Sequence, residues 1–377
     1  MAKRRAPAPG EFALIDAFLA PFGLDRSAPS SRRRGVRAGP GDDCAQLVPA
    51  RGQVLVATTD AVLDGVHFDL RRCTPEDAGW KALAVNLSDL AAAGATPRWI
   101  LCALGVPREP GALGIASRLG AGMADLLART GGALVGGNVT RSPVWSLTIT
   151  ALGEAKQPLT RAGGRPGDAL VLVGTLGAAA LGLRLLQARP ARSAPSRAAS
   201  KVGRIIAAQT RPWPQLAAGL AAAGLARAAV DLSDGLLQDA GHLCQRSGCG
   251  AVLDCALFPR LPEVAAAERG DGRQGAHPYA LSLGGGEEYA LLLAVASRRE
   301  RRLLAALAKC GSPGVVIGRL EEGSAVRLVE GDKALPLPAH GGFDHLAGRP
   351  ARREPRGSQA ARARAPVATL RSPCRSA

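Results

Sequence analysis

Acidic residues in this sequence recur where apolar runs end, beside Gly, Ser or Thr. The segments that carry them are GDDC with Asp42 and Asp43, TTD with Asp60, NLSD with Asp89, VDLSD with Asp231 and Asp234, and GGGEE with Glu287 and Glu288. No Lys or Arg lies within two positions of any of these acids. Clustered carboxylates without cations raise one another's pKa. A bound hard cation relieves that repulsion, and Mg²⁺ combines carboxylate oxygens with waters and substrate phosphates. Together the segments predict a metal–phosphate site.

Two of these segments share a polar-Leu-Ser-Asp core. NLSDLAAAG covers residues 86–94, and DLSDGLLQDAG covers residues 231–241. We interpret them as two halves of one site. Asn86 and Asp89 lie three positions apart, so on a helix both side chains can face that site.

The second segment also permits a simpler interpretation. Asp and Ser are common at helix starts, so Ser233 or Asp234 could only cap a helix that begins at Leu236. Asp239 lies inside that helix, and we expect it to be structural or solvated.

Other segments could bind phosphate. LVGGNVTR, residues 134–141, predicts a strand running into a Gly-Gly turn, whose backbone N–H groups can meet a phosphate. Arg161 precedes a Gly-rich turn, where a guanidinium group can clamp phosphate. His67 lies between Val66 and Phe68 and fits either a structural role or a ligand contact. The sequence contains neither GxxxxGK[ST] nor GxGxxG, so neither a P-loop nor a Rossmann nucleotide site is indicated.

Strands and helices that would position these segments alternate along the chain. Residues 54–60 are β-rich, and Thr74, Pro75 and Asp77 form a typical helix start. Further strands are expected at 99–106, 132–138, 145–155, 169–174 and 228–235, and helices at 11–22, 112–129, 214–223 and 236–246. The alternation predicts an α/β (α+β) fold with two layered domains. A Gly/Pro cluster at 158–167 marks the boundary. We therefore expect domains at 1–157 and 158–346, followed by a disordered Arg/Pro-rich tail at 347–377.

The formal net charge of +17 is unevenly distributed. Lys and Arg concentrate in Pro-, Ser- and Gly-rich stretches near the N-terminus, around 189–204 and in the tail, which leaves the remaining chain near neutral. A folded basic face with stacking aromatics is not indicated, because aromatics make up only 3% of the residues, so we expect no nucleic-acid partner. The eight cysteines form no CxxC pair, and no apolar run reaches the ~20 residues of a membrane span. We expect a soluble, cytoplasmic protein without a membrane partner.

Eight segments together resemble the thiamine-monophosphate kinase family, which belongs to the aminoimidazole ribonucleotide synthetase-like superfamily. They are GDDCAQL, TTDAVLDGVHF, KALAVNLSDLAAAGA, LVGGNVTR, LTRAGGRPGD, DLSDGLLQDAGHL, GGGEEYALLL and GGFDHL, in the family's order. The resemblance spans residues 10–346. It implies a two-domain fold, with an N-terminal mixed sheet and helices and a C-terminal α/β domain. It also implies ATP-dependent, Mg²⁺-assisted phosphorylation of thiamine monophosphate to thiamine diphosphate, in a homodimer formed through the N-terminal domains.

The resemblance also implies roles for individual residues. Several Mg²⁺ ions would be held by Asp43, Thr58, Thr59, Asp60, Asp89, Asn138, Asp231 and Asp234. ATP would touch Gly137, Asn138, Arg161 and Ser233, and the thiamine substrate would touch His67, Glu287 and Phe343. No catalytic base is expected, because the accepting phosphate oxygen is already ionised at neutral pH. One departure is Asn138, which stands where the family usually has Asp and offers a neutral oxygen in place of a carboxylate.

Two alternatives stay open at this point. One is a sister enzyme of the superfamily, such as a cyclo-ligase, a selenophosphate synthetase or a hydrogenase-maturation dehydratase. The other is a non-catalytic protein whose basic tails bind RNA or acidic partners, which the salt dependence of binding would reveal.

Overall fold

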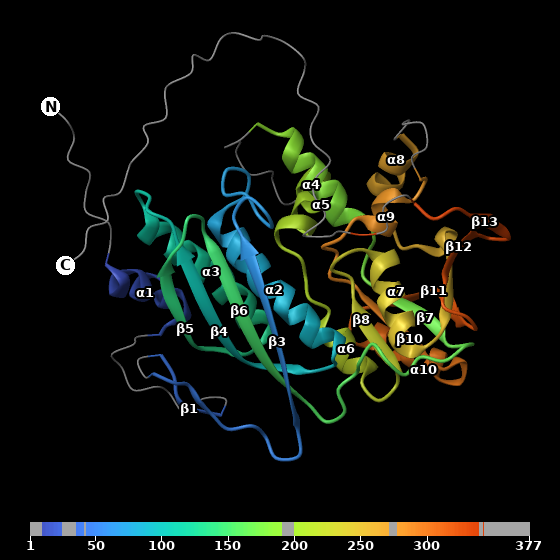
Figure 1. The fold of residues 1–377 in the computed structure, drawn as a ribbon, viewed down its shortest axis with the longest axis horizontal. Coiled ribbons are helices and arrows are strands. Elements are labelled where there is room, and N and C mark those ends of the chain that lie inside the picture. Colours follow the sequence, from blue (N-terminus) through green and yellow to red (C-terminus); the bar gives the residue numbers. More distant parts are fainter. Residues whose placement is uncertain are drawn as a thin grey trace, which may run out of the picture. The chain divides into compact units, whose positions relative to one another are not determined.

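The computed structural model describes residues 10–24, 35–40, 43–190, 200–270, 277–338 and 342 (Figure 1). Three expectations fall wholly or partly on residues outside these ranges: the disordered tail, the basic stretch around 189–204, and the substrate contact of Phe343.

The N-terminal half is built around a four-stranded mixed sheet, as expected. Its strand order is β3-β6-β4-β5, with β3–β6 and β6–β4 antiparallel and β4–β5 parallel. The elements of this half are α1 (Glu11–Leu19), η1 (Ala20–Phe22), β1 (Val36–Ala38), β2 (Gln46–Leu47), β3 (Val54–Leu63), α2 (Pro75–Ala92), β4 (Thr96–Val106), α3 (Ala112–Thr130), β5 (Ala133–Arg141) and β6 (Ser146–Ala155). Helices α2 and α3 pack against each other on one face of the sheet (Figure 1).

The opposite face of this sheet is only partly covered. Val36 of β1 packs on Trp99 and Val135, which closes one end of the face. Further along the strands, the side chains of Ala103 and Thr148 are exposed. Strands β3 and β5 are the two edges, and neither has a second neighbour among the described strands.

The C-terminal half contains a seven-stranded sheet in the order β13-β12-β9-β11-β7-β10-β8. Its elements are β7 (Ala169–Val173), α4 (Ala178–Ala188), α5 (Lys201–Thr210), α6 (Leu216–Ala222), β8 (Ala228–Asp231), α7 (Leu236–Ser247), β9 (Gly250–Asp254), η2 (Cys255–Leu257), α8 (Pro262–Gly270), α9 (Ala280–Gly284), β10 (Leu291–Val295), α10 (Ser297–Lys309), β11 (Gly314–Glu321), β12 (Val326–Glu330) and β13 (Lys333–Leu335). Strands β7, β8 and β10 are buried along their whole length, which explains their continuous apolar sequence.

Helix α2 joins the two halves. It begins with the predicted capping box, in which Thr74 accepts from the backbone N–H of Asp77 and Asp77 accepts from that of Thr74. Helix α6 of the C-terminal half approaches it closely, because a Cβ atom on Gly219 would lie 1.9 Å from the carbonyl oxygen of Ala91. Three polar residues of α2, Lys81, Asn86 and Ser88, are buried between the two halves, where they need partners.

Two local expectations are wrong. The sequence predicted a turn at Gly136 and Gly137, but β5 continues through both residues to Arg141. Gly137 is needed for close strand contact, since a Cβ atom there would lie 1.9 Å from the carbonyl oxygen of Cys102. The alternative that Ser233 or Asp234 caps α7 also fails, because Gly235 is the N-cap residue and no side chain caps it.

No helix among the described residues has the length and apolar character needed to cross a membrane.

Candidate metal and phosphate site

Strand β3 presents Thr58 and Asp60 to helix α2. Side chains alternate along this strand, and both residues are half-buried whereas the intervening Thr59 is exposed. Thr58 Oγ1 donates a 2.5 Å hydrogen bond to Asp89 Oδ2. Asn86 Oδ1 accepts a 3.1 Å hydrogen bond from the backbone N–H of Asp60. Asn86 and Asp89 therefore both face β3, as their helical spacing predicted, and that they share one metal site stays a prediction.

Helix α2 reaches the C-terminal sheet through the residue beside Asp89. Ser88 Oγ donates a 2.8 Å hydrogen bond to Asp231 Oδ2, and both residues are buried. Burial, followed by the negative charge of Asp89, raises the pKa of Asp231 to about 8, and the Ser88 hydrogen bond opposes this shift. The NLSD and DLSD segments thus lie against each other, as their interpretation as two halves of one site requires.

Tyr289 shows that the acids converge. This buried residue follows the GGGEE segment, and burial raises the pKa of its hydroxyl group well above the usual value. The charges of Glu287, Asp231, Asp60 and Asp89 raise it in the same direction. Acids from two strands, a helix and a loop, far apart in the sequence, therefore act on one side chain.

Asp239 supports the loop that carries Asp234. Asp239 Oδ2 accepts 3.1 Å hydrogen bonds from the backbone N–H groups of Asp234 and Gly235. The expected structural role fits these bonds, but Asp239 is buried rather than solvated. Burial, followed by the charge of Asp234, raises the pKa of Asp239 to about 7. Asp234, Asp239 and His242 also bring ligand atoms within 4.8 Å of one another, a spacing at which they could hold a metal ion.

The GGGEEY segment folds onto this loop in an unusual backbone conformation. Glu287 and Tyr289 have φ values of 59° and 48°, and they are the non-glycine residues with positive φ in the described part of the chain. The Glu287 backbone N–H donates 2.7 Å to the Ser233 carbonyl oxygen, and that of Tyr289 donates 2.8 Å to Leu232. Such conformations cost free energy and cluster at ligand sites.

Glu287 has a cationic partner that the sequence did not reveal. Lys81 of α2 lies 2.6 Å from Glu287 Oε1 and donates a 2.8 Å hydrogen bond to the carbonyl oxygen of His67. Gln209 of α5 donates a 2.5 Å hydrogen bond to Glu287 Oε2. The expectation that these acids lack cations is therefore wrong for Glu287. Lys81 is 2% exposed. In the sequence, its isolated charge in an apolar helical stretch is the signal that could have indicated a buried acidic partner.

Glu288 faces a different element. Its Oε1 accepts a 3.1 Å hydrogen bond from the backbone N–H of Ala179, in the first turn of α4. Burial raises the pKa of Glu288 to about 8, and the N–H groups at the start of α4 oppose the shift. Glu288 thus supports the GGGEEY segment by capping a helix.

The remaining predicted residues are less closely grouped. Asn138 pairs with Ala103, in a row of exposed side chains on the sheet face away from α2, and Thr59 projects from that same face. Strands β3 and β5 lie three strand spacings apart, roughly 14 Å. Asp43 is exposed between β1 and β2. Arg161 is exposed as well, although its charge acts on Asp231 and Asp239 and slightly opposes their raised pKa.

A separate cavity of about 310 Å³ lies beyond Asn138, between α1 and the ends of β4 and β5. Arg108, Val139 and Arg141 are among the residues that line it. This cavity was not predicted, although Arg141 ends the LVGGNVTR segment.

The donor set of the central group suits a hard cation. Asp60, Asp89 and Asp231 offer only oxygen atoms, and the buried Asp231 carries a raised pKa that a neighbouring cation would lower. Such residues fit Mg²⁺ better than a soft metal, for which thiolate and imidazole ligands are typical.

Comparison with known proteins places the chain in a family. The model of the AIR synthase related protein N-terminal domain matches residues 41–155, and that of the C-terminal domain matches residues 165–330. The thiamine-monophosphate kinase of Escherichia coli K12 is 39% identical over 312 residues, which cover 82% of this chain and 90% of that protein. This chain belongs to the thiamine-monophosphate kinase family.

Solved structures agree with this assignment to the thiamine-monophosphate kinase family. The kinase from Stenotrophomonas maltophilia K279a is 35% identical, with a TM-score of 0.72 over 87% of this chain and 98% of that one. AaThiL complexed with AMPPCP and TMP is 29% identical, with a TM-score of 0.68 over 92% of this chain and 100% of that one. HypE, a hydrogenase maturation protein of E. coli, is 21% identical with a TM-score of 0.64 and shares the fold. The predicted two-domain superfamily fold is thereby confirmed.

Proposed function

We propose that this protein transfers the γ-phosphoryl group of ATP to thiamine monophosphate and releases thiamine diphosphate and ADP. The observation that carries the proposal is that hydrogen bonds hold Asp60, Asp89 and Asp231 around helix α2, beside a strained loop that carries Glu287. The family supports it, because curated relatives are named thiamine-monophosphate kinases and AaThiL is complexed with AMPPCP, an ATP analogue, together with TMP.

The acids of the central group would hold several Mg²⁺ ions. We assign Asp60, Asp89, Asp231 and Asp234 as ligands, with Thr58 orienting Asp89 through its hydrogen bond. Bound Mg²⁺ would supply the positive charge that ATP and thiamine monophosphate need in order to approach each other. Thr59, Asn138 and Asp43 stay proposed ligands, on or beyond the other face of the sheet.

The chain's own contribution to the reaction is positioning. An ionised oxygen of thiamine monophosphate attacks the γ-phosphorus of ATP, a new P–O bond forms, and the bond to the β–γ bridging oxygen breaks. No proton has to be removed from the acceptor, so no side chain is assigned as a base. Ser88 and Asp239 keep Asp231 and Asp234 in place, since each makes hydrogen bonds to the segment that it supports.

The substrates are assigned to two sides of this group. Thiamine monophosphate would lie against His67, Glu287 and Phe343, while ATP would reach Arg161, Ser233, Gly137 and Asn138. The 310 Å³ cavity supports ATP binding in the N-terminal half, because it begins directly after Asn138 and is lined by Arg108 and Arg141.

We further propose a homodimer formed through the N-terminal domain, residues 1–157. Edge strand β3 has ten residues and no outer neighbour among the described strands, and Val54 and Leu55 on it are 47% and 48% exposed. Long apolar edges of this kind usually pair with another chain. Residues 158–346 would form the second domain. We place the enzyme in the cytoplasm, where its described cysteines, all free, would stay reduced.

The test of this function is an acceptor comparison. Purified protein is incubated with ATP, Mg²⁺ and either thiamine monophosphate or free thiamine, and the products are separated by chromatography. We expect thiamine diphosphate from the monophosphate and no phosphorylation of free thiamine. The absence of diphosphate at saturating Mg²⁺, from protein shown to be folded, would contradict the proposal.

A further inference from the structure

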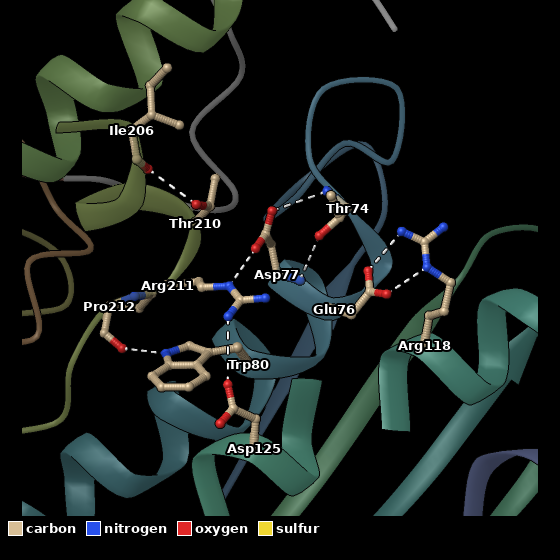
Figure 2. Close-up of polar contacts among 10 residues, drawn as sticks. All are labelled: Thr74, Glu76, Asp77, Trp80, Arg118, Asp125, Ile206, Thr210, Arg211 and Pro212. Carbon is tan, nitrogen blue, oxygen red and sulfur yellow. Dashed lines mark hydrogen bonds and ion pairs between the residues drawn. The ribbon is translucent and has the colours of Figure 1, made fainter. Parts of the chain in front are cut away.

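The end of helix α5 is clamped onto the first turns of helix α2 (Figure 2). Arg211 Nε lies 2.5 Å from Asp77 Oδ1, and a second nitrogen of Arg211 lies 3.6 Å from Asp125 on α3. Trp80 Nε1 donates a 2.8 Å hydrogen bond to the carbonyl oxygen of Pro212, and the Arg211 guanidinium group lies 5.4 Å from the centre of the Trp80 ring. We call the contacts of Asp77, Trp80, Lys81, Gln209 and Arg211 between α2 and α5 the clamp. Those of Asp77, Trp80 and Arg211 form its outer side and fix α5 relative to α2.

The buried side of the same clamp reaches Glu287. Lys81 follows Trp80 on α2, and Gln209 lies two residues before Arg211. Lys81 and Gln209 bind different oxygens of the Glu287 carboxylate, at 2.6 and 2.5 Å. Both are almost fully buried, at 2% and 4% exposure. Because a carboxylate oxygen has two lone pairs, each oxygen keeps one for a ligand.

Glu287 needs such support. Its φ of 59° is unfavourable for a residue with a Cβ atom, and the surrounding contacts must stabilise it. Lys81 also binds the carbonyl oxygen of His67, so one ammonium group joins both loops that are assigned to the thiamine substrate.

We propose that Gln209 and Lys81 are positioning residues that set the affinity for thiamine monophosphate by fixing Glu287, and that they do not set the affinity for ATP. This inference rests on the proposed function. Its selectivity follows from the geometry of α2, because Lys81 precedes Asp89 by eight residues, roughly 12 Å along the helix. Lys81 and Gln209 hold the Glu287 carboxylate, whereas the link from Glu287 to the loop of the metal-binding acids runs through its backbone N–H to Ser233, which a change at Gln209 leaves in place.

Gln209→Met tests the proposal, because it removes the donor while retaining most of the buried volume. We expect the KM for thiamine monophosphate to rise about tenfold, which is typical for the loss of one hydrogen bond to a charged group. The KM for ATP should change less than about twofold, because the lost hydrogen bond is to Glu287, which is assigned to the thiamine substrate. Gln209→Glu should also raise the KM for thiamine monophosphate. It replaces the donating amide group by a second carboxylate beside Glu287 and leaves the rest of the side chain unchanged.

The matched control is Arg118→Gln. Arg118 makes a two-pronged ion pair with Glu76, also on the first turn of α2 (Figure 2), whereas the Glu287 carboxylate is held by Lys81 and Gln209. This variant should keep both KM values. Lys81→Arg, which retains donors, should preserve more affinity for thiamine monophosphate than Lys81→Met does.

A double variant separates positioning from general loosening. In a Glu287→Gln background, Gln209→Met should add little to the rise in KM, because residues that act through one contact are not additive. Additive effects, or equal changes in both KM values for Gln209→Met and Gln209→Glu, would overturn the inference. If the unmodified protein makes no thiamine diphosphate, the proposed function fails instead, so the two failures are distinguishable.

Discussion

Ser88 donates a 2.8 Å hydrogen bond to Asp231, and this bond connects helix α2 of the N-terminal half to the last residue of strand β8. Both side chains are buried. A buried carboxylate without its donor would be poorly solvated, so the bond helps to keep Asp231 ionised and correctly oriented.

We therefore expect Ser88→Ala to weaken Mg²⁺ binding. Loss of a hydrogen bond to a charged group costs about 1.5–3 kcal/mol, so the Mg²⁺ concentration at half-maximal rate should rise roughly tenfold or more. Metal titration of the steady-state rate measures this. Ser282→Ala is the matched control. It also removes a hydrogen bond from a serine hydroxyl to a buried carboxylate, at 2.9 Å, but that carboxylate belongs to Glu268, which is not an assigned metal ligand. Equal metal titrations for Ser88→Ala and the unmodified protein would refute the role of Ser88.

The raised pKa values of Asp231 and Asp239, about 8 and about 7, predict how stability depends on pH. Unfolded aspartate has a pKa of about 3.9, so between pH 5 and 8 these two carboxyl groups bind more protons in the folded, metal-free protein than in the unfolded chain. The free energy of unfolding should therefore decrease as pH rises through this range. Thermal unfolding in the presence of a chelator would show it as a falling Tm.

Mg²⁺ should reverse this pH effect in part. The metal competes with protons for Asp231, so the rise in Tm on adding Mg²⁺ should be larger at pH 8 than at pH 5. A metal-free Tm that rises steadily over this range, with a metal effect independent of pH, would show that these acids do not form the binding group.

Asn138→Asp tests the departure from the family pattern. Restoring a carboxylate should keep or raise activity and lower the Mg²⁺ requirement, because a charged oxygen binds Mg²⁺ more strongly than an amide oxygen does. Thr148→Asp is the control, since Thr148 lies in the same exposed row two strands away. If Asn138→Asp leaves the metal titration unchanged, Asn138 is not near a metal.

Deletion of residues 347–377 should leave turnover intact. The segment carries no motif of the family, and it contributes mainly positive charge. Steady-state rates of the shortened and full chains provide the comparison. A large loss of turnover in a shortened chain with an unchanged Tm would show that the tail helps to build the site.

The sequence predicted the parts of this fold that depend on local signals. The capping box of Thr74 and Asp77 placed the start of α2, and the apolar runs placed the strands. Spacing also placed Asn86 and Asp89 on one side of that helix, where both meet β3.

Long-range packing decided what the sequence did not predict. Gly136 and Gly137 look like a turn, but strand pairing with β4 keeps them extended. Thr58 and Thr59 are adjacent in one motif, yet strand alternation directs them to opposite faces of the sheet. Lys81 and Gln209 lie far from Glu287 in sequence, so only the folded chain brings their donors to its carboxylate.

The most direct test of the central claim follows the transferred group. ATP labelled at the γ-phosphate is incubated with the protein, Mg²⁺ and thiamine monophosphate for a single turnover. We predict that the label appears in the terminal phosphate of thiamine diphosphate, in equal amount to the ADP formed. Label found only in free inorganic phosphate, with thiamine monophosphate unchanged, would contradict direct transfer at this site.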